Sequence, residues 1–160
     1  MDANTLVYTF VKVDMKNEAQ YQLVHDVRRT FIDDLGDNQA SLIEDDEECD
    51  IFLLFNREEP VATGRIHKKT ETSFKLERIA VLKKNWGKGY GKELMRQLIL
   101  KTLEVAKPSD LIYLHAQTHA VGFYEKCGFE KVGEMFIEDE TIEHYKMIFR
   151  VPSWLHTPSA

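Results

Sequence analysis

The chain has 160 residues, of which 43% are hydrophobic and 30% charged, and its 21 basic and 27 acidic residues give a formal net charge of −6. This size and composition predict one soluble globular domain, residues 1–160, with a sizeable buried core. The negative charge argues against nucleic acid as a partner and favours a cationic small molecule.

The first half of the chain begins with a strand and a helix. Alternating apolar residues predict a strand over residues 5–13. Asn17 and Gln20 resemble a capping box, which opens a helix that we expect to end near residue 32. The acidic run 44–48 allows two interpretations, a solvated loop or a site that attracts a cationic amine, and we favour the loop.

Strands and helices alternate through the rest of the chain. The continuous apolar run 51–55 is typical of a strand buried on both faces, and Pro108 ends the longest helical pattern. The further pattern predicts strands over 61–68, 73–82, 111–116, 129–136 and 141–150, and helices from the glycine-rich loop to 106 and over 120–126. This order indicates an α+β fold, or a mixed α/β design of three layers.

The most informative segment follows the strand over residues 73–82. Gly87, Gly89 and Gly91 occupy three of five positions, directly before a helix. Glycine lets the backbone approach a ligand closely, and the free N–H groups of a helix N-terminus bind anions. Four lysines surround these glycines, at positions 83, 84, 88 and 92. The segment therefore predicts a phosphate-binding loop, although each lysine alone is equally well explained as solvating it.

Two nucleotide-binding motifs do not fit this loop. A Walker A motif would need glycine where Trp86 stands and a hydroxyl residue where Glu93 stands. The dinucleotide fingerprint would need a third glycine in place of Lys92. The sequence therefore gives only weak support to both nucleotide-binding interpretations.

Two blocks of sequence resemble the GCN5-related N-acetyltransferase (GNAT) family. The first is Lys84-Asn85-Trp86-Gly87-Lys88-Gly89, which matches the family's acetyl-CoA pyrophosphate pattern Gln/Arg-x-x-Gly-x-Gly/Ala except at Lys84. The second runs from Ala116 to Phe129 and is similar to the family's Asn-x-x-Ala-x-x-x-Tyr-x-Lys-x-Gly-Phe segment, with Gln117 in the Asn place. Segments 27–32 and 142–147 resemble the small bacterial branch of ElaA and YjcF.

The resemblance implies the GNAT acyl-CoA N-acyltransferase fold, with a central, mostly antiparallel twisted sheet flanked by helices. It places a cofactor-binding core over residues 50–150 and acceptor-side elements over 17–48 and 136–150. It implies acetyl-CoA-dependent transfer of an acetyl group to a primary amine of a small molecule by direct attack. The resemblance is also compatible with a homodimer that forms through exposed strand edges. The alternative is a CoA-binding sensory or regulatory domain without catalysis.

The resemblance also assigns roles to single residues. Tyr124 takes the general-acid position, although it could instead only pack. Glu77 takes the position of a base that acts through water, although it could equally be a surface glutamate paired with Arg78 or a lysine. His115, His119 and His144 are rival candidates for the base. The expected acceptor-binding residues are Arg28, Phe31 and His144. The expected cofactor-binding residues are Ile79, Ala80, Val81, Lys84, Trp86, Gly87, Lys88, Gly89, Tyr90, Gly91, Lys92, Gln117 and Phe123.

Location is predicted from what the sequence does not contain. The acidic start of the chain leads into no apolar segment of the kind that a signal peptide needs. No window approaches the roughly 18 apolar residues of a membrane span. Cys49 and Cys127 lie far apart, and neither paired cysteines nor a His-x-x-x-His spacing suggests a metal site. We therefore predict a cytoplasmic protein with free thiols, no bound metal and no membrane partner.

Overall fold

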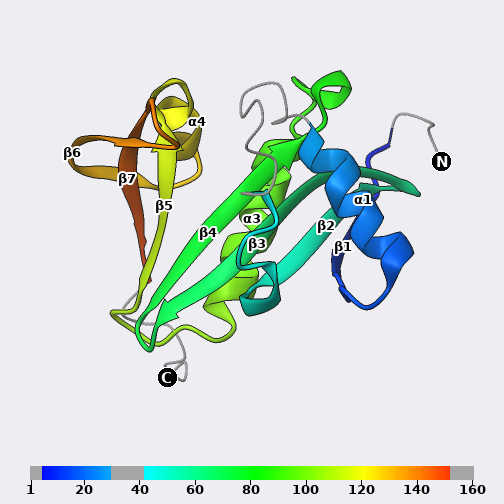
Figure 1. Cartoon of the computed structure of the whole chain (residues 1–160), viewed down its shortest axis with the longest axis horizontal. Coiled ribbons are helices and arrows are strands. Elements are labelled where there is room, and N and C mark those ends of the chain that lie inside the picture. Colours follow the sequence, from blue (N-terminus) through cyan, green and yellow to red (C-terminus); the bar gives the residue numbers. More distant parts are fainter. Residues whose placement is uncertain (1–4, 30–41, 152–160) are drawn as a thin grey trace. The chain divides into compact units, whose positions relative to one another are not determined.

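The computed structural model describes residues 5–29 and 42–151 of the chain (Figure 1). Its strands are β1 (Tyr8–Lys12), β2 (Asp50–Asn56), β3 (Glu59–Thr70), β4 (Ser73–Val81), β5 (Leu111–Gln117), β6 (Glu130–Glu138) and β7 (Ile142–Arg150). Its α-helices are α1 (Glu18–Arg28), α3 (Tyr90–Leu103) and α4 (Val121–Lys126), and its 3-10 turns are η3 (Asp46–Glu48), η4 (Lys83–Asn85) and η5 (Thr118–Ala120). Within the described residues, no helix is long and apolar enough to cross a membrane.

The strands form one mixed sheet in the order β1-β2-β3-β4-β5-β7-β6. The β4–β5 pair is parallel, whereas β1–β2, β5–β7 and β6–β7 are antiparallel. This α+β architecture is the predicted fold class. The chain divides into two compact units, which we describe separately: Met1–Arg65 with Arg78–Gln97, and Ile66–Glu77 with Leu98–Ala160.

The first unit has its core between α1 and strands of the sheet (Figure 1). Val24 and Val27 of α1 are fully buried against Ile51 and Leu53 of β2. The helix begins as predicted, because the Asn17 side chain accepts a hydrogen bond from the Gln20 amide. The Gln20 side chain departs from a capping box, since it accepts from the amide of Asp14 instead.

Tyr90, the first residue of α3, packs on the β1–β2 pair of the same unit. Its ring meets that of Tyr8 edge to face, with centroids 6.2 Å apart. Its hydroxyl accepts a hydrogen bond from Asn56 Nδ2 at 3.0 Å. The N-terminus of α3 is thereby fixed to the sheet, and so is the glycine-rich loop that precedes it.

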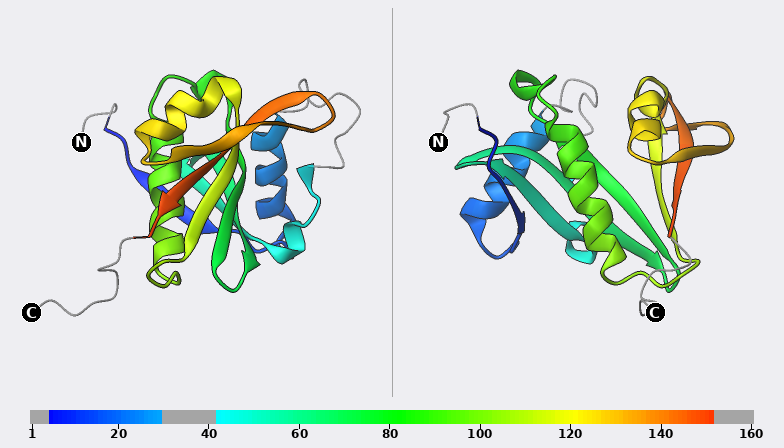
Figure 2. Two further views of the ribbon diagram at one scale, coloured as in Figure 1. Left: turned by 90° about the vertical axis from the view of Figure 1, so that its left-hand side faces the viewer. Right: turned by 180° about the vertical axis from the view of Figure 1, so that it is seen from behind.

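The second unit is built on β5, with β7 and β6 beside it and the short helix α4 against β5 and β6 (Figure 2). Ile112, Leu114 and Ala116 are buried, and they alternate with half-buried Tyr113 and His115 on the opposite face of β5. Half-buried polar side chains can carry chemistry that a fully apolar face cannot.

The pairing of β4 with β5 is short. Ser73 to Lys75 face Leu111 to Tyr113, and the register ends there. Beyond Tyr113, β5 pairs with β7 on its other side as far as Gln117. Beyond Tyr113, the backbone N–H and C=O groups of β5 that face β4 are therefore not part of the β4–β5 pairing.

Candidate functional site

The glycine-rich loop has the backbone that an anion site needs. Gly87 and Gly89 have φ angles of +79° and +83°, a conformation that side chains rarely adopt, and nothing would meet an added Cβ at either position within 4 Å. The first helical hydrogen bond of α3 runs from the Glu93 amide to the Gly89 carbonyl at 3.1 Å. The amides of the preceding residues lie at the helix N-terminus, where intrahelical acceptors are lacking. The loop is open, and its donors are positioned for an anion.

The Trp86 side chain and the Asn85 backbone anchor the loop to the end of β4 and the residue after it. Trp86 Nε1 donates to the Val81 carbonyl at 2.8 Å, while the Asn85 amide donates to the Leu82 carbonyl at 2.8 Å. Asn85 is 4% exposed, and within the described residues its buried Nδ2 group finds no acceptor. A buried donor without a partner is costly, so a ligand acceptor here would be stabilising.

The predicted cofactor residues of the loop differ in what they can offer. Lys84 forms an ion pair with Glu59 at 3.2 Å, and both side chains are exposed, so the pair holds Lys84 only weakly. Tyr90 is buried, and its hydroxyl is used by Asn56, which leaves its backbone amide for a ligand. The indole of Trp86 is largely exposed.

The structure favours a second alignment of the pyrophosphate pattern. In this second alignment the pattern Gln/Arg-x-x-Gly-x-Gly starts two residues later than in the first. It then runs from Trp86, in the Gln/Arg position, to Gly91. In this alignment both pattern glycines, Gly89 and Gly91, lie at the N-terminus of α3, beside the free amides. The sequence alone gave no reason to choose this register, because both alignments lack Gln or Arg at the first place.

The end of β4 also belongs to the first unit. Ala80 is buried in the core, and Ile79 and Val81 are half-buried. Arg78 has a φ of 52°, which is unusual for a non-glycine residue inside a strand and interrupts the regular pleat. The predicted pantetheine edge therefore starts at an irregular point of the strand.

Tyr124 lies in α4 of the second unit. Its ring packs edge to face between Phe123 and Phe129, with centroid distances of 5.1 and 6.3 Å. Burial raises the pKa of the phenol, and the nearby Cys127 raises it further. Within the described residues its hydroxyl makes no hydrogen bond. Tyr124 is thus a protonated donor at neutral pH. Phe123 packs on Tyr124, as the packing alternative expected.

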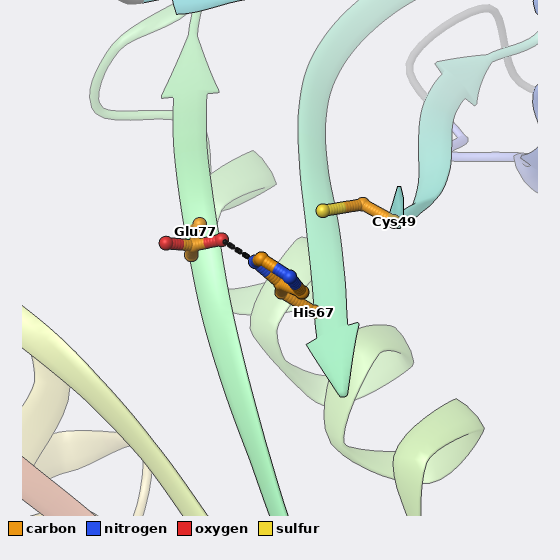
Figure 3. A group of neighbouring side chains, drawn as sticks. All are labelled: Cys49, His67 and Glu77. Carbon is orange, nitrogen blue, oxygen red and sulfur yellow. Dashed lines mark hydrogen bonds and ion pairs between the residues drawn. The ribbon is translucent and has the colours of Figure 1, made fainter. Parts of the chain in front are cut away.

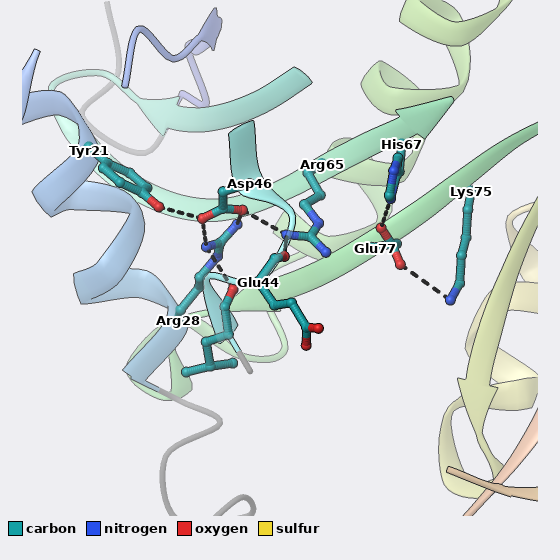
Figure 4. Close-up of polar contacts among 9 residues, drawn as sticks. Tyr21, Arg28, Glu44, Asp46, Arg65, His67, Lys75 and Glu77 are labelled. Atoms are coloured by element: carbon teal, nitrogen blue, oxygen red, sulfur yellow. Dashed lines mark hydrogen bonds and ion pairs between the residues drawn. The ribbon is translucent and has the colours of Figure 1, made fainter. Parts of the chain in front are cut away.

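Glu77 is held by two neighbours of the second unit. His67 Nδ1 lies 2.9 Å from Oε1, and Lys75 Nζ lies 3.2 Å from Oε2 (Figures 3 and 4). The His67 and Glu77 side chains are only 7% and 9% exposed. Cys49, also labelled in Figure 3, belongs to the first unit. Both carboxylate oxygens of Glu77 are engaged.

Gln117 and His144 face each other in the β5–β7 register. Gln117 ends β5, and η5 and α4 follow it directly, so both residues lie beside the entry to the segment that carries Tyr124. His144 is 4% exposed, and its Nδ1 lies 2.9 Å from the Ile142 carbonyl. His115 Nδ1 lies 3.0 Å from Glu138 Oε1.

Arg28, predicted to bind the acceptor, is buried in the first unit. Its two terminal nitrogens bond both oxygens of Asp46, at 2.7 and 3.0 Å (Figure 4). Arg65 Nη1 bonds Asp46 Oδ1 at 2.8 Å, and the Tyr21 hydroxyl donates to Oδ2 at 2.5 Å. Arg28, Asp46 and Arg65 side chains are all 1% exposed. This geometry gives Arg28 a structural role. Phe31 lies outside the described residues.

Asp46 corrects the expectation that the acidic run 44–48 is a solvated loop. Four of the five residues are exposed or half-buried, but Asp46 is buried. Burial by itself would raise the pKa of Asp46, but the hydrogen bonds from Arg28, Tyr21 and Arg65 outweigh burial and lower it. The carboxylate therefore stays ionised, and sequence reasoning missed it because its partners are far away in the chain.

A family model for the acetyltransferase (GNAT) family matches residues 17–129. The match covers more than half of the chain, which therefore belongs to the GNAT acetyltransferase family. YyaT, an uncharacterised protein of Bacillus subtilis, is 38% identical over 95 residues, 58% of this chain and 61% of YyaT. YjcF of Bacillus subtilis, described as an uncharacterised N-acetyltransferase, is 35% identical over 106 residues, 64% of this chain and 71% of YjcF. The chain thus matches less than two thirds of YyaT.

Solved structures show the same fold. ElaA of Escherichia coli superimposes with a TM-score of 0.71 at 20% identity, covering 91% of this chain and all (100%) of ElaA. An aminoglycoside 6′-N-acetyltransferase complexed with coenzyme A gives 0.73 at 16% identity, covering 95% of this chain and 99% of that enzyme. The GNAT acyl-CoA N-acyltransferase fold is confirmed, and so is the resemblance to ElaA and YjcF.

Proposed function

We propose that the protein is an acetyl-CoA-dependent N-acetyltransferase that acts on a primary amine of a small molecule in the cytoplasm. The observation that carries the proposal is the open glycine backbone at Gly87 and Gly89, directly before the N-terminus of α3. The family to which the chain belongs supports it. So does the coenzyme A bound to the structural neighbour described above.

The loop residues would hold the pyrophosphate of acetyl-CoA. The amides from Gly87 to Lys92 and the dipole of α3 favour negative charge at this point. Trp86 fixes the loop through the Val81 carbonyl, and Asn85 supplies a buried donor that lacks a partner. Lys84, Lys88 and Lys92 add positive charge, and the strand edge from Ile79 to Val81 would pair with the pantetheine arm. Phe123 and Gln117 complete the proposed contacts.

Bound acetyl-CoA would supply a thioester carbonyl for attack by the amine. Tyr124 would donate its proton to the leaving sulfur, because burial keeps the phenol protonated and its hydroxyl has no competing hydrogen bond within the described residues.

Glu77 would accept the proton of the attacking ammonium through a water molecule. His67 and Lys75 contact its carboxylate and hold it in one position. We propose His144 as an acceptor-binding residue, since it is buried beside the end of β5. The roles of Arg28 and Phe31 in acceptor binding stay predictions, and the buried Arg28–Asp46 pair argues for structure at Arg28.

The alternative is a CoA-binding domain without catalysis. The absence of Gln or Arg at the start of the pyrophosphate pattern and Gln117 in the Asn place favour this alternative, whereas Tyr124 favours an enzyme. The two functions differ in turnover, not in cofactor affinity.

The test is CoA release from acetyl-CoA with polyamines, amino acids, amino sugars and a lysine-rich peptide as acceptors. The thiols of Cys49 and Cys127 react with thiol reagents, so a blank without amine is subtracted. We expect release that depends on one class of small amine. Acetyl-CoA binding without release for any amine would favour the sensory domain, and a protein that does not bind acetyl-CoA would contradict both. Size-exclusion chromatography of the same sample measures whether the chain forms a homodimer.

A further inference from the structure

Three metal-ligating side chains gather where β6 turns into β7. They are Glu138, the last residue of β6, Asp139 in the turn, and His144 near the start of β7. One ligand atom from each lies within 4.8 Å of the other two. All three belong to the second unit, and we call them the β6–β7 cluster.

His144 directs its Nε2 atom toward this cluster. Its Nδ1 lies 2.9 Å from the Ile142 carbonyl, and a carbonyl oxygen only accepts, so Nδ1 carries the proton. In the neutral ring Nε2 is then an acceptor. The side chain is 5% exposed, and Nε2 lies 3.8 Å from Glu138 Oε2, too far for a hydrogen bond. A histidine nitrogen and a carboxylate oxygen thus face each other, and these are two atom types that a zinc ion binds.

Glu138 is held from its other side. Its Oε1 accepts a hydrogen bond from His115 Nδ1 at 3.0 Å, which leaves Oε2 for the cluster. The ring of Phe136 lies against both imidazoles, with centroids 4.9 Å from His115 and 5.9 Å from His144. The cluster therefore has a packed and hydrogen-bonded surround.

The cluster itself carries two carboxylates, those of Glu138 and Asp139. Lys75 of β4 acts electrostatically on Glu138, but its Nζ already pairs with Glu77 at 3.2 Å. Lys146 lies opposite His115 in the β5–β7 register, with its Nζ over the ring of Tyr113. Two neighbouring carboxylates favour a cation.

We propose that the β6–β7 cluster binds one divalent transition-metal ion through His144 Nε2, Glu138 Oε2 and the Asp139 carboxylate. Zinc bonds of about 2.1 Å in a tetrahedral site set ligand atoms about 3.4 Å apart, close to the 3.8 Å between Nε2 and Oε2. The Ile142 carbonyl and His115 are then the outer partners that ligating imidazoles and carboxylates require. An imidazole ligand selects zinc-like ions over magnesium or calcium.

The proposal departs from the sequence expectation of no metal site. That expectation used spacings of histidine and cysteine along the chain, whereas these ligands meet because the hairpin returns His144 to the end of β6. The metal site shares His144 with the proposed acceptor site, but metal binding is measured without acetyl transfer, so the failure of either proposal can be told from the failure of the other.

The test is calorimetric titration of Zn²⁺ into chelator-treated protein in which both cysteines are replaced by serine. We expect one ion per chain. His144→Gln, Glu138→Gln and Asp139→Asn should each weaken binding at least about 100-fold, and His115→Gln about 10-fold, as expected for an outer partner. His119→Gln and Glu134→Gln, outside the cluster, are the matched controls and should bind like the parent. Mg²⁺ should not bind measurably.

Thermal unfolding of each variant without metal shows that it is folded. If the buried His144→Gln variant does not fold, Asp139→Asn in the exposed turn decides the matter. The proposal is overturned if the parent protein does not bind Zn²⁺, or if the folded cluster variants bind it as tightly as the His119→Gln and Glu134→Gln controls. Equal affinity for Mg²⁺ would overturn the assignment to a transition metal.

Discussion

The proposed chemistry depends most on one hydroxyl, that of Tyr124. Replacing Tyr124 by Phe keeps the ring packing against Phe123 and Phe129 and removes only the proton donor. General acid catalysis contributes about 10²–10⁴-fold, so we expect kcat to fall by that factor while acetyl-CoA affinity is unchanged. Because burial raises the pKa of Tyr124 above its ordinary value of 10.0, its deprotonation should not reduce activity below pH 10.

Steady-state kinetics with the best amine from the acceptor panel, together with calorimetric binding of acetyl-CoA, measure the two effects separately. Tyr145→Phe, on β7, is the control for the loss of a phenol. Turnover of the Tyr124→Phe variant at the rate of the control would show that another group protonates the sulfur.

Asp46 is a buried charge whose loss should harm stability. In Asp46→Asn, Arg28 and Arg65 stay 1% exposed without a carboxylate between them. Breaking a buried ion pair by removing one partner costs about 3–5 kcal/mol, so we expect that loss in the free energy of unfolding at pH 7. Asp50→Asn, whose ion pair with Lys12 is exposed, should cost less than about 1 kcal/mol.

The pH dependence of this effect has a definite sign. The folded state lowers the pKa of Asp46 below its ordinary 3.8, so the carboxylate stabilises the fold above pH 4. That contribution is lost as the pH falls through the lower folded pKa. Urea unfolding at pH 7 and in the acid range should therefore show the gap between parent and Asp46→Asn narrowing on acidification. A gap that stays constant, or one no larger than that of Asp50→Asn, would contradict the structural role.

Among the elements, the loop that opens α3 allows a test with a matched control. Gly89 and Gly133 have φ angles of +83° and +72°, and an added Cβ would meet nothing within 4 Å at either position. Alanine in this conformation costs about 1–2 kcal/mol at each position. Only Gly89→Ala should also weaken acetyl-CoA binding, about tenfold or more, since the proposed phosphate passes over this backbone.

Thermal unfolding and calorimetric titration with acetyl-CoA give the two numbers for each variant. Equal losses of acetyl-CoA affinity in both variants would mean that strain alone acts, and that the loop does not hold the cofactor. Gly133 lies in β6, within the irregular stretch of its pairing with β7, far along the chain from the loop.

Local pattern predicted most elements because each depends on near neighbours. Alternation over residues 73–82 corresponds to β4, and the apolar run 51–55 to β2. Helix ends were less predictable. The helix expected to reach Ala106 ends at Leu103, and just beyond it the Val105 amide bonds the Thr102 carbonyl, three residues back, in place of the i→i−4 bond of a regular helix.

Contacts between distant segments were beyond the sequence pattern. Arg28 was predicted to bind the acceptor, and its buried partner Asp46 could not be foreseen because it lies 18 positions further along the chain. The same holds for His115 and Glu138, which are 23 positions apart and meet only because β5, β7 and β6 are neighbours in the sheet. Family motifs located the loop and Tyr124, but the surrounding hydrogen bonds needed the three-dimensional structure.

The sequence predicts that the whole molecule is one domain. Because the structure divides into two compact units, this prediction can be tested by asking whether the units unfold together. Their boundary falls inside three elements, since β3, β4 and α3 each begin in one unit and end in the other. Unfolding one unit alone would cut through two strands and a helix, and would expose backbone groups that these elements pair. We therefore expect both units to unfold in one cooperative transition.

Two local probes can test this cooperativity. The chain has two tryptophans, so Trp154→Phe leaves Trp86 as a fluorescent reporter in the first unit. Hydrogen exchange of the β7 amides, measured by mass spectrometry at each urea concentration, reports on the second unit. We expect coincident midpoints and equal free energies of unfolding from both probes. Separate midpoints would mean that the units are independent domains, and that residues 1–160 do not fold as one. If the midpoints separate, added acetyl-CoA should raise both of them only when the binding of acetyl-CoA requires both units to be folded.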